Sequence, residues 1–225
     1  MTRENVGHKI RVLMNGFDVK MLPFHSSPKE PNGKFKIAHL GTLYYNRSPE
    51  NFFMALRDFV IENQLGSSDI EVRLVGHADT FNGKSVWEMR KEHSLEDIVK
   101  IEPPVTHKES LRIMIESDVL LLFAQGQYMQ IPGKVYEYLF GGKPILALCE
   151  KESETGMLVE HLKAGVVIEP HDTREIMQAL QNLYATCRKK SARNGTRETR
   201  LREFLPDFQA GVLAGLLSDV LKQKS

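Results

Sequence analysis

The chain has 225 residues, of which 41% are hydrophobic and 26% are charged, and its formal net charge is +1. This is the composition of an ordinary globular protein, and the near-neutral charge excludes a general electrostatic attraction to nucleic acid or membranes. Two cysteines, no apolar run near the roughly 18 residues of a membrane span, and a polar stretch over residues 1–19 indicate a cytoplasmic protein without disulfides, membrane spans or a secretion signal.

Between residues 36 and 188, short apolar runs alternate with amphipathic stretches. Strands are expected at 36–43, 70–75, 98–101, 119–123, 145–148 and 166–168. Helices are expected to begin near residues 49, 84, 106, 133, 155 and 172. Repeated strand–helix units with apolar strands are typical of a parallel sheet that is covered on both faces. The predicted fold class is therefore α/β, with a Rossmann-like parallel sheet of about six strands and helices on both faces.

Two helix starts carry capping residues. Ser48 is expected to cap a helix that has Pro49 at its first position. Thr106 and Glu109 form a capping box at the start of another helix. The only tryptophan, Trp87, is expected in the core rather than at a ligand.

The segment 131–144, Ile-Pro-Gly-Lys-Val-Tyr-Glu-Tyr-Leu-Phe-Gly-Gly-Lys-Pro, is the most informative part of the chain. In an open α/β sheet, ligands bind at the carboxyl ends of the strands, beside helix N-termini. Lys134 lies in the first turn of the helix that begins at Gly133, where the helix dipole disfavours a cation. A bound anion would remove that conflict. Glu137 lies on the same helical face, and the pair therefore suits a phosphate and a ribose.

This segment resembles the nucleotide-sugar-binding domain of retaining glycosyltransferases with the GT-B fold, in the glycosyl transferases group 1 family. Many members carry a run like Pro-x-Lys-x-x-Glu-Tyr-x-x-x-Gly-Lys-Pro-Ile at this place, and the order of elements over residues 36–188 also matches. The resemblance implies that Glu137 holds the ribose hydroxyls of the donor nucleotide. It also implies that Gly133, Lys134 and Val135 contact the diphosphate.

The loop after the first strand supplies a second set of candidate residues. Gly41 would let the backbone approach phosphate closely, although a plain turn between strand and helix is the alternative. Family members often have Gly-Arg here and a Lys six residues after the glycine. This chain has Thr42 and Arg47 at those positions, so Arg47 is expected to bind and stabilise the diphosphate.

The sugar and base sites depart from the family pattern or are weakly marked. Many members carry a Glu eight residues before the ribose Glu, where this chain has Met129. Amides such as Gln127 and Gln130 would then hold the donor sugar, or the donor chemistry differs. The family places the nucleotide base near Pro104 and Val105, although these residues equally suit a rigid turn before a capped helix.

The histidines give no metal-type spacing, and the chain has no Asp-x-Asp sequence. We therefore expect no metal and no other cofactor. His39 and His77 are expected near the strand ends that form the crevice, although most histidines are expected to be surface or packing residues.

Three regions are predicted along the chain. Residues 1–35, with Asn15-Gly16-Phe17-Asp18, resemble the connector between the two halves of these enzymes, which implies a preceding acceptor-binding domain. Residues 36–188 form the nucleotide-sugar-binding domain. Residues 189–225 are expected to form C-terminal helices that pack back on the other half. The basic run 188–202 is expected to be a solvated surface, with contact to anionic lipid at the inner face of the membrane as the alternative.

The predicted function is that of the donor-binding half of a glycosyltransferase. It would transfer a sugar from a nucleoside diphosphate sugar, expected to be a UDP-sugar, to a glycan or lipid-linked acceptor. Arg47 and Lys134 would stabilise the leaving diphosphate. Two alternatives are a UDP-N-acetylglucosamine 2-epimerase-like enzyme of the same fold and a non-catalytic Rossmann-like binding module.

Overall fold

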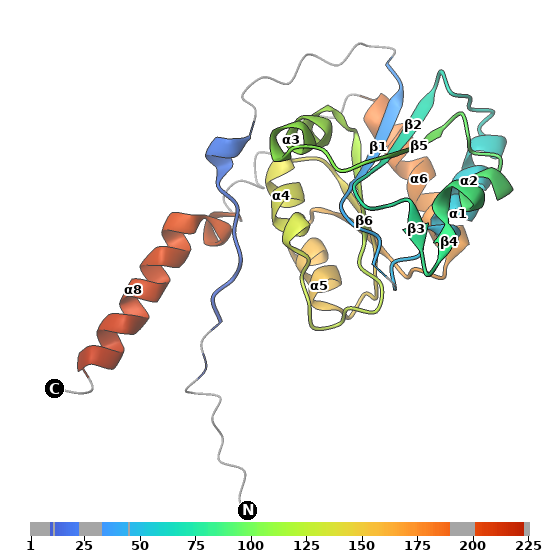
Figure 1. Ribbon diagram of the computed structural model, residues 1–225. Coiled ribbons are helices and arrows are strands. Elements are labelled where there is room, and N and C mark those ends of the chain that lie inside the picture. Colours follow the sequence, from blue (N-terminus) through green and yellow to red (C-terminus); the bar gives the residue numbers. More distant parts are fainter. Residues whose placement is uncertain (1–9, 11, 23–32, 45, 190–200, 223–225) are drawn as a thin grey trace, which may run out of the picture.

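The computed structural model describes residues 10, 12–22, 33–44, 46–189 and 201–222 of the chain (Figure 1). Its main feature is a six-stranded parallel sheet in the order β5-β2-β1-β6-β7-β8. The strands are β1 (Phe35–Leu40), β2 (Ile70–Val75), β5 (Val99–Glu102), β6 (Val119–Phe123), β7 (Ile145–Leu148) and β8 (Gly165–Ile168). The predicted fold class is thus confirmed.

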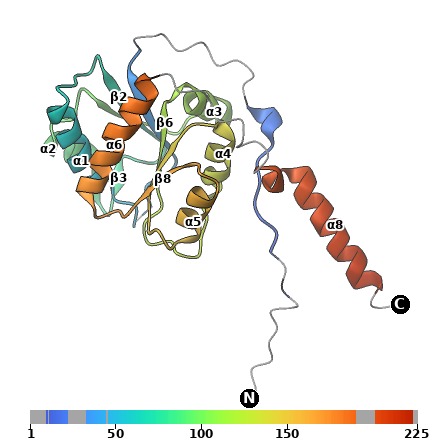
Figure 2. The ribbon, with the colours of Figure 1, turned by 180° about the vertical axis from the view of Figure 1, so that it is seen from behind.

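Helices cover both faces of this sheet, as Figures 1 and 2 show from opposite sides. One face carries α1 (Glu50–Glu62), α2 (Val86–Glu92) and α6 (Thr173–Arg188), and the other carries α3 (His107–Glu116), α4 (Gly133–Gly141) and α5 (Glu154–His161). Outside these layers lie η2 (Val19–Met21), η3 (Arg202–Phe204) and the long helix α8 (Pro206–Lys222).

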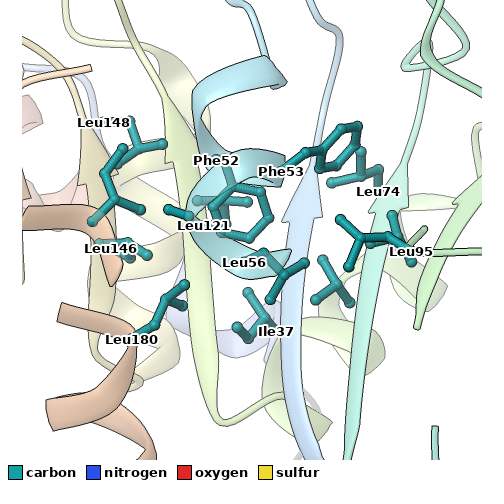
Figure 3. Close-up of a cluster of buried hydrophobic side chains, with 14 of the residues drawn as sticks. Ile37, Phe52, Phe53, Leu56, Leu74, Leu95, Leu121, Leu146, Leu148 and Leu180 are labelled. Atoms are coloured by element: carbon teal, nitrogen blue, oxygen red, sulfur yellow. The ribbon is translucent and has the colours of Figure 1, made fainter. Parts of the chain in front are cut away.

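The strands are apolar on both sides because both faces of the sheet are covered. In β6, all five residues are buried, and alternate side chains enter different cores. Leu121 joins Phe52 and Phe53 of α1 in one hydrophobic cluster, which Figure 3 shows in close-up. Leu120 and Leu122 enter the cluster beneath α3, α4 and α5.

The strand order reverses between β1 and β6, which are neighbours in the sheet but far apart in sequence. From β1 the chain runs outward to β2 and β5, and from β6 it runs the other way to β7 and β8. Adjacent loops at such a switch point leave the sheet in opposite directions, which opens a crevice at the carboxyl ends of the strands. The crevice of this domain is therefore bordered by the loops after β1 and β6.

Most element boundaries agree with the sequence-based expectation to within two residues. One strand was predicted to run to residue 43 but ends at Leu40. The chain turns at Gly41, which has a φ of +154° and lies beside Gly76. A two-stranded hairpin, β3 (Thr80–Phe81) and β4 (Lys84–Ser85), was not predicted, and it delays the start of α2 to Val86.

Two further expectations about side chains need correction. Ser48 does not cap α1 from the N-cap position, which Pro49 occupies, although its Oγ accepts from the Glu50 amide. Trp87 is not in the core: its side chain is 44% exposed, and the Arg90 guanidinium lies over its ring. The short helix α2 buries Val86 and Met89 instead.

The connector and the C-terminal segment meet beside α4 (Figure 1). The Phe17 amide donates to Phe204 O over 3.2 Å, and the rings of Phe17 and Phe140 pack with centroids 5.8 Å apart. Phe204 also packs on Tyr136. Beyond this contact, α8 buries none of its residues. The segments on either side of the predicted nucleotide-binding domain are thus joined to each other at one helix of that domain.

The close contact between the loops after β1 and β2 can be tested by substituting two glycines. Gly76 has a φ of +133°, and a Cβ added to it would lie 2.2 Å from Gly41 O. Gly83 also has a positive φ, of +76°, but a Cβ there would meet nothing within 4 Å. Gly83→Ala should lower the free energy of unfolding by about 1 kcal/mol. Gly76→Ala should cost a further ~1–3 kcal/mol, because the backbone must move.

Urea unfolding of the two variants and the wild-type protein measures this difference. Equal losses for Gly76→Ala and Gly83→Ala would show that the contact between the two loops does not constrain the fold.

Candidate functional site

The N-terminus of α4 faces the crevice and has no side-chain cap, because its N-cap residue is Pro132. The Val135 amide donates to Pro132 O over 2.9 Å and so is already engaged within the first turn. The amides of Gly133 and Lys134 precede it, at the end of the helix where backbone donors point outward. Of the three residues predicted to contact the diphosphate, Val135 has its amide engaged within the helix, and Gly133 and Lys134 lie before it.

Lys134 and Glu137 bind each other in this structure. The Lys134 Nζ lies 2.7 Å from Glu137 Oε2, and His107 Nε2 lies 3.5 Å from the same oxygen. The Glu137 side chain is 18% exposed and that of Lys134 is 25% exposed, so both remain accessible at the crevice. The motif therefore brings a cation and a carboxylate together, as its spacing predicted. Sequence reasoning missed His107, which comes from α3.

The predicted base-binding residues lie next to this ion pair. Pro104 and Val105 are exposed and directly precede Thr106, whose Oγ1 caps α3 at the Glu109 amide. Because His107 begins α3 and reaches Glu137, the segment 104–107 borders the same end of the crevice. A base in this segment and a ribose at Glu137 would be neighbours.

Arg47 supplies a second cation from the loop after β1. It is only 7% exposed, its Nη2 donates to Gln127 Oε1 over 2.8 Å, and its guanidinium lies over the Tyr44 ring. Burial lowers the pKa of Arg47, but an arginine remains charged in proteins. Within the described residues, no carboxylate forms an ion pair with it. The domain thus holds a nearly buried cation whose described partners are a neutral amide and an aromatic ring.

The loop that carries Gly41 and Thr42 is fixed against the loop after β2. The Leu43 amide donates to the backbone oxygen of His77 over 3.0 Å, and Gly76 touches Gly41. Thr42 is half-buried on this loop. His77 thus lies at the strand ends, as expected, and its backbone oxygen joins the two loops.

His39 is the one histidine of the crevice that is fully enclosed. It is 3% exposed, and its Nδ1 lies 3.1 Å from Leu121 O. Burial, together with the charges of Arg47 and Lys134, lowers the pKa of His39 to about 4, against the effect of the Leu121 hydrogen bond. The ring is therefore neutral near pH 7 in the free protein.

The loop between β6 and α4 contains the position where many family members have a Glu. Met129 is 88% exposed there and offers no hydrogen-bonding group of comparable strength. The loop is anchored instead by Glu150, whose two carboxylate oxygens accept from the Gly126 amide. Glu150 follows β7 and was not found by sequence reasoning, because its role depends on the strand order.

A polar cavity of about 320 Å³ lies on the α1 side of this loop. Residues after β1, β6, β7 and β8 line it: Asn46, Ser48, Asn51, Gln125, Tyr128, Glu150, Glu169, Pro170 and His171. Of the loops that line this cavity, only those after β1 and β6 were predicted to contribute to a site, so the sequence analysis missed the residues after β7 and β8.

The part of the chain that the structure describes carries neither a metal-type cluster nor a membrane-spanning helix. In that part of the chain, no group of three or more His, Cys, Asp or Glu side chains is placed to hold a metal ion. None of its helices has the length and apolar character needed to span a bilayer.

Comparisons with known proteins give the fold a context. No protein-family model and no curated protein sequence matches the chain. Among solved structures, HepE from Anabaena in complex with UDP-glucose is similar, with 20% identity and a TM-score of 0.69 over 93% of this chain and 57% of that one. Sucrose-phosphate synthase from Thermosynechococcus elongatus has 15% identity and a TM-score of 0.65, over 96% and 53%.

A third similar structure is a single domain. It is the C-terminal domain of LpcC, a glycosyl transferase group 1 family protein from Francisella tularensis, with 16% identity and a TM-score of 0.58 over 78% of this chain and 92% of that one. The chain has the fold of one glycosyltransferase domain. It spans about half the length of the whole enzymes above, and the predicted half of a GT-B fold is confirmed at the level of fold.

The buried neutral state of His39 predicts a pH dependence of stability. An unfolded histidine has a pKa of about 6.5, above the folded value. Between these two values the unfolded chain binds a proton that the folded chain does not. Stability should therefore fall as the pH decreases from about 6.5 to about 4, by about 3 kcal/mol from this residue.

Denaturant unfolding at several pH values tests this, with His39→Gln as the comparison. The loss of stability in this pH range should be smaller in His39→Gln than in the wild-type protein. Parallel curves for the two proteins would contradict the burial of a neutral His39.

Proposed function

We propose that this chain is the donor-binding half of a glycosyltransferase that transfers a sugar from a UDP-sugar to a glycan or lipid-linked acceptor. One observation carries the proposal: the Lys134–Glu137 pair at the open N-terminus of α4 lies at the same crevice as the enclosed cation Arg47. The solved structures of HepE with UDP-glucose and with UDP support the choice of donor, since they share this fold.

The proposed binding mode exchanges contacts within the protein for contacts with the nucleotide. Lys134 would leave Glu137 and bind the diphosphate, together with the amides of Gly133 and Lys134. The Glu137 carboxylate would then accept hydrogen bonds from the ribose hydroxyls. Both groups are already at the crevice, so the exchange requires only side-chain rotation.

Arg47 would meet the diphosphate from the opposite side of the crevice. Its Nη2 donates to Gln127 in the free structure, and a phosphate oxygen is a stronger acceptor for a guanidinium than a neutral amide. Gln127 would then be released to hydrogen-bond the donor sugar, as Gln130 could from the same loop. Met129 is too exposed and too apolar to replace the missing carboxylate.

The base would lie along the backbone of Pro104 and Val105, beside His107 and Glu137. Val105 is accessible, at 36% exposure. Thr42, next to Gly41, offers a hydroxyl to the phosphates in place of the arginine that is usual in the family.

Catalysis would be electrostatic. When the bond between sugar and diphosphate breaks, negative charge grows on the leaving oxygens. Arg47, Lys134 and the α4 amides are positioned before the reaction to stabilise that charge, which costs no reorganisation at the moment of transfer. In this proposal these groups neutralise the diphosphate without a metal ion or other cofactor.

The acceptor would be bound by a preceding domain, which would form the other wall of the cleft. The connector over residues 12–22 is packed on α4 through Phe17, and α8 extends from the same place (Figure 1). One exposed set of apolar residues on α8 is suited to contact that domain: Phe208, Val212, Leu213, Leu217, Val220 and Leu221. The proposal includes a peripheral membrane contact through the basic run 188–202. Most of that run lies outside the described residues.

The ribose assignment gives a binding prediction. Glu137→Ala should weaken UDP binding more than tenfold, or about 1.4 kcal/mol, because a hydrogen bond to a charged group is lost. Glu160→Ala, which removes an exposed carboxylate from α5, is the matched control and should leave the affinity unchanged. Calorimetric titration with UDP measures both. Equal affinities of Glu137→Ala and the wild-type protein would refute the ribose assignment.

The two-domain proposal gives an activity prediction. The 225-residue chain should bind the nucleotide but transfer no sugar, because a single wall cannot position the acceptor or exclude water, effects worth about 7–11 kcal/mol of barrier. A longer protein that includes the preceding domain should be active in a radiolabelled UDP-sugar assay. Equal turnover by the two proteins would contradict the proposal.

A further inference from the structure

His39 has an unused hydrogen-bonding atom at the crevice. Its Nδ1 faces a backbone oxygen, Leu121 O, which can only accept, so the proton of the neutral ring is on Nδ1. The Nε2 atom then carries a lone pair. It is buried and has no partner among the described residues. A buried polar atom without a partner is rare in folded proteins and requires an explanation.

The position of Nε2 relates it to the crevice. A Cβ built on Gly41 would lie 3.8 Å from Nε2 and 3.9 Å from the neighbouring ring carbon, and within the described residues no other part of the chain outside the adjoining positions comes within 4 Å of it. The space left by the absent Gly41 side chain is therefore bordered by the edge of the His39 ring. A ligand oxygen that lies over Gly41 would meet this edge.

The charges around His39 are those of the proposed anion site. Arg47, on the loop after β1, and Lys134, on α4, are the charged groups that act on it. Tyr138 of α4 shares Leu121 O through its hydroxyl, and burial raises the pKa of that hydroxyl. Two further neighbours are apolar: the Phe123 ring of β6, 5.0 Å away between centroids, and Leu74 of β2, its partner in the sheet register.

We propose that His39 contacts the diphosphate and takes up a proton when a nucleotide sugar binds. The proton would be placed on Nε2, which would change from an acceptor that repels the anion into a donor to a phosphate oxygen over Gly41. Nδ1 would keep its hydrogen bond to Leu121 O. This inference rests on the proposed function, because it requires the diphosphate to lie between Arg47 and Lys134.

The electrostatics favour this change only in the complex. Burial and, to a smaller extent, two cations keep the free ring neutral, with its pKa near 4. A diphosphate would offset both cations and add an acceptor for the new N–H, and each of these effects favours the charged ring. By linkage, binding that takes up a proton becomes weaker as the pH rises.

Calorimetry can count the proton. UDP-glucose is the suitable probe, because both of its phosphates are esterified, whereas a terminal phosphate titrates near pH 6 and would contribute protons of its own. Titration at about pH 6, in two buffers of different ionisation enthalpy, should show uptake of about one proton per UDP-glucose. Between the His39 pKa of the free protein and that of the complex, the affinity should fall about tenfold for each unit of pH.

Two variants assign the proton. His39→Gln should lose the uptake, and His107→Gln should retain it, although His107 also lies at the crevice. Long-range ¹⁵N spectra of the wild-type histidines provide an independent reading that does not depend on the folding of a variant. His39 should carry a proton only on Nδ1 in the free protein and on both nitrogens in the complex.

Three other outcomes would overturn this inference, and one of them would also overturn the proposed function. Binding of UDP-glucose without proton uptake would overturn this inference and leave the proposed function intact. Uptake that persists in His39→Gln and is lost in His107→Gln would assign the proton to His107 and also overturn it. Failure of the wild-type protein to bind either UDP-glucose or UDP would overturn both proposals.

Discussion

The separation of β1 from β6 is the constraint on which the site depends. The two strands pair only at Ile37 with Val119 and at Ala38 with Leu120, and they then part at the switch point of the sheet. Where the strands part, buried backbone N–H and C=O groups lose their partners in the neighbouring strand. This costs free energy unless side chains hydrogen-bond to these groups instead. Two side chains do so: the Leu40 amide donates to the Tyr138 hydroxyl, and His39 Nδ1 donates to Leu121 O.

These two side chains connect the fold to its chemistry. Tyr138 belongs to α4, one residue after Glu137, so the hydrogen bond that satisfies β1 also fixes the helix whose N-terminus faces the crevice. His39 satisfies β6 and presents its remaining nitrogen beside Gly41. The crevice therefore lies where β1 and β6 part. The backbone hydrogen bonds lost there are replaced by side chains of α4 and β1, and Lys134, Glu137 and Arg47 lie on α4 or on the loop after β1.

The sequence predicted the parts of this arrangement that are local. Strands β2, β6 and β7 were placed correctly because each is an apolar run between clear breaks, and the spacing of Lys134 and Glu137 on one helical turn predicted their contact. The β3–β4 hairpin was missed, because strands of two residues leave no periodicity. Trp87 was misplaced, because α2 is short and only Val86 and Met89 face the core.

The parts that could not be predicted depend on the order of strands in the sheet. The contacts of His107 with Glu137 and of Glu150 with Gly126, and the cavity beside Glu169, form because β5, β7 and β8 end at the same edge as β1 and β6. A pattern within one segment cannot show which strand ends will be neighbours. The motif resemblance could supply roles for Glu137 and Lys134, but it could not reveal that Lys134 and His107 share the Glu137 carboxylate in the free protein.

In the free protein, the charged groups of the candidate site are bound by other groups of the same chain. Lys134 is paired with Glu137, and Arg47 is held by an amide and an aromatic ring. An isolated buried charge would be costly, and these contacts reduce that cost while no anion is bound. The Arg47–Gln127 hydrogen bond is weaker than the one a phosphate oxygen would make with the guanidinium. Binding would therefore draw on interactions that the fold already positions, and its specificity for a nucleotide over a free anion would come from the carboxylate that Lys134 releases.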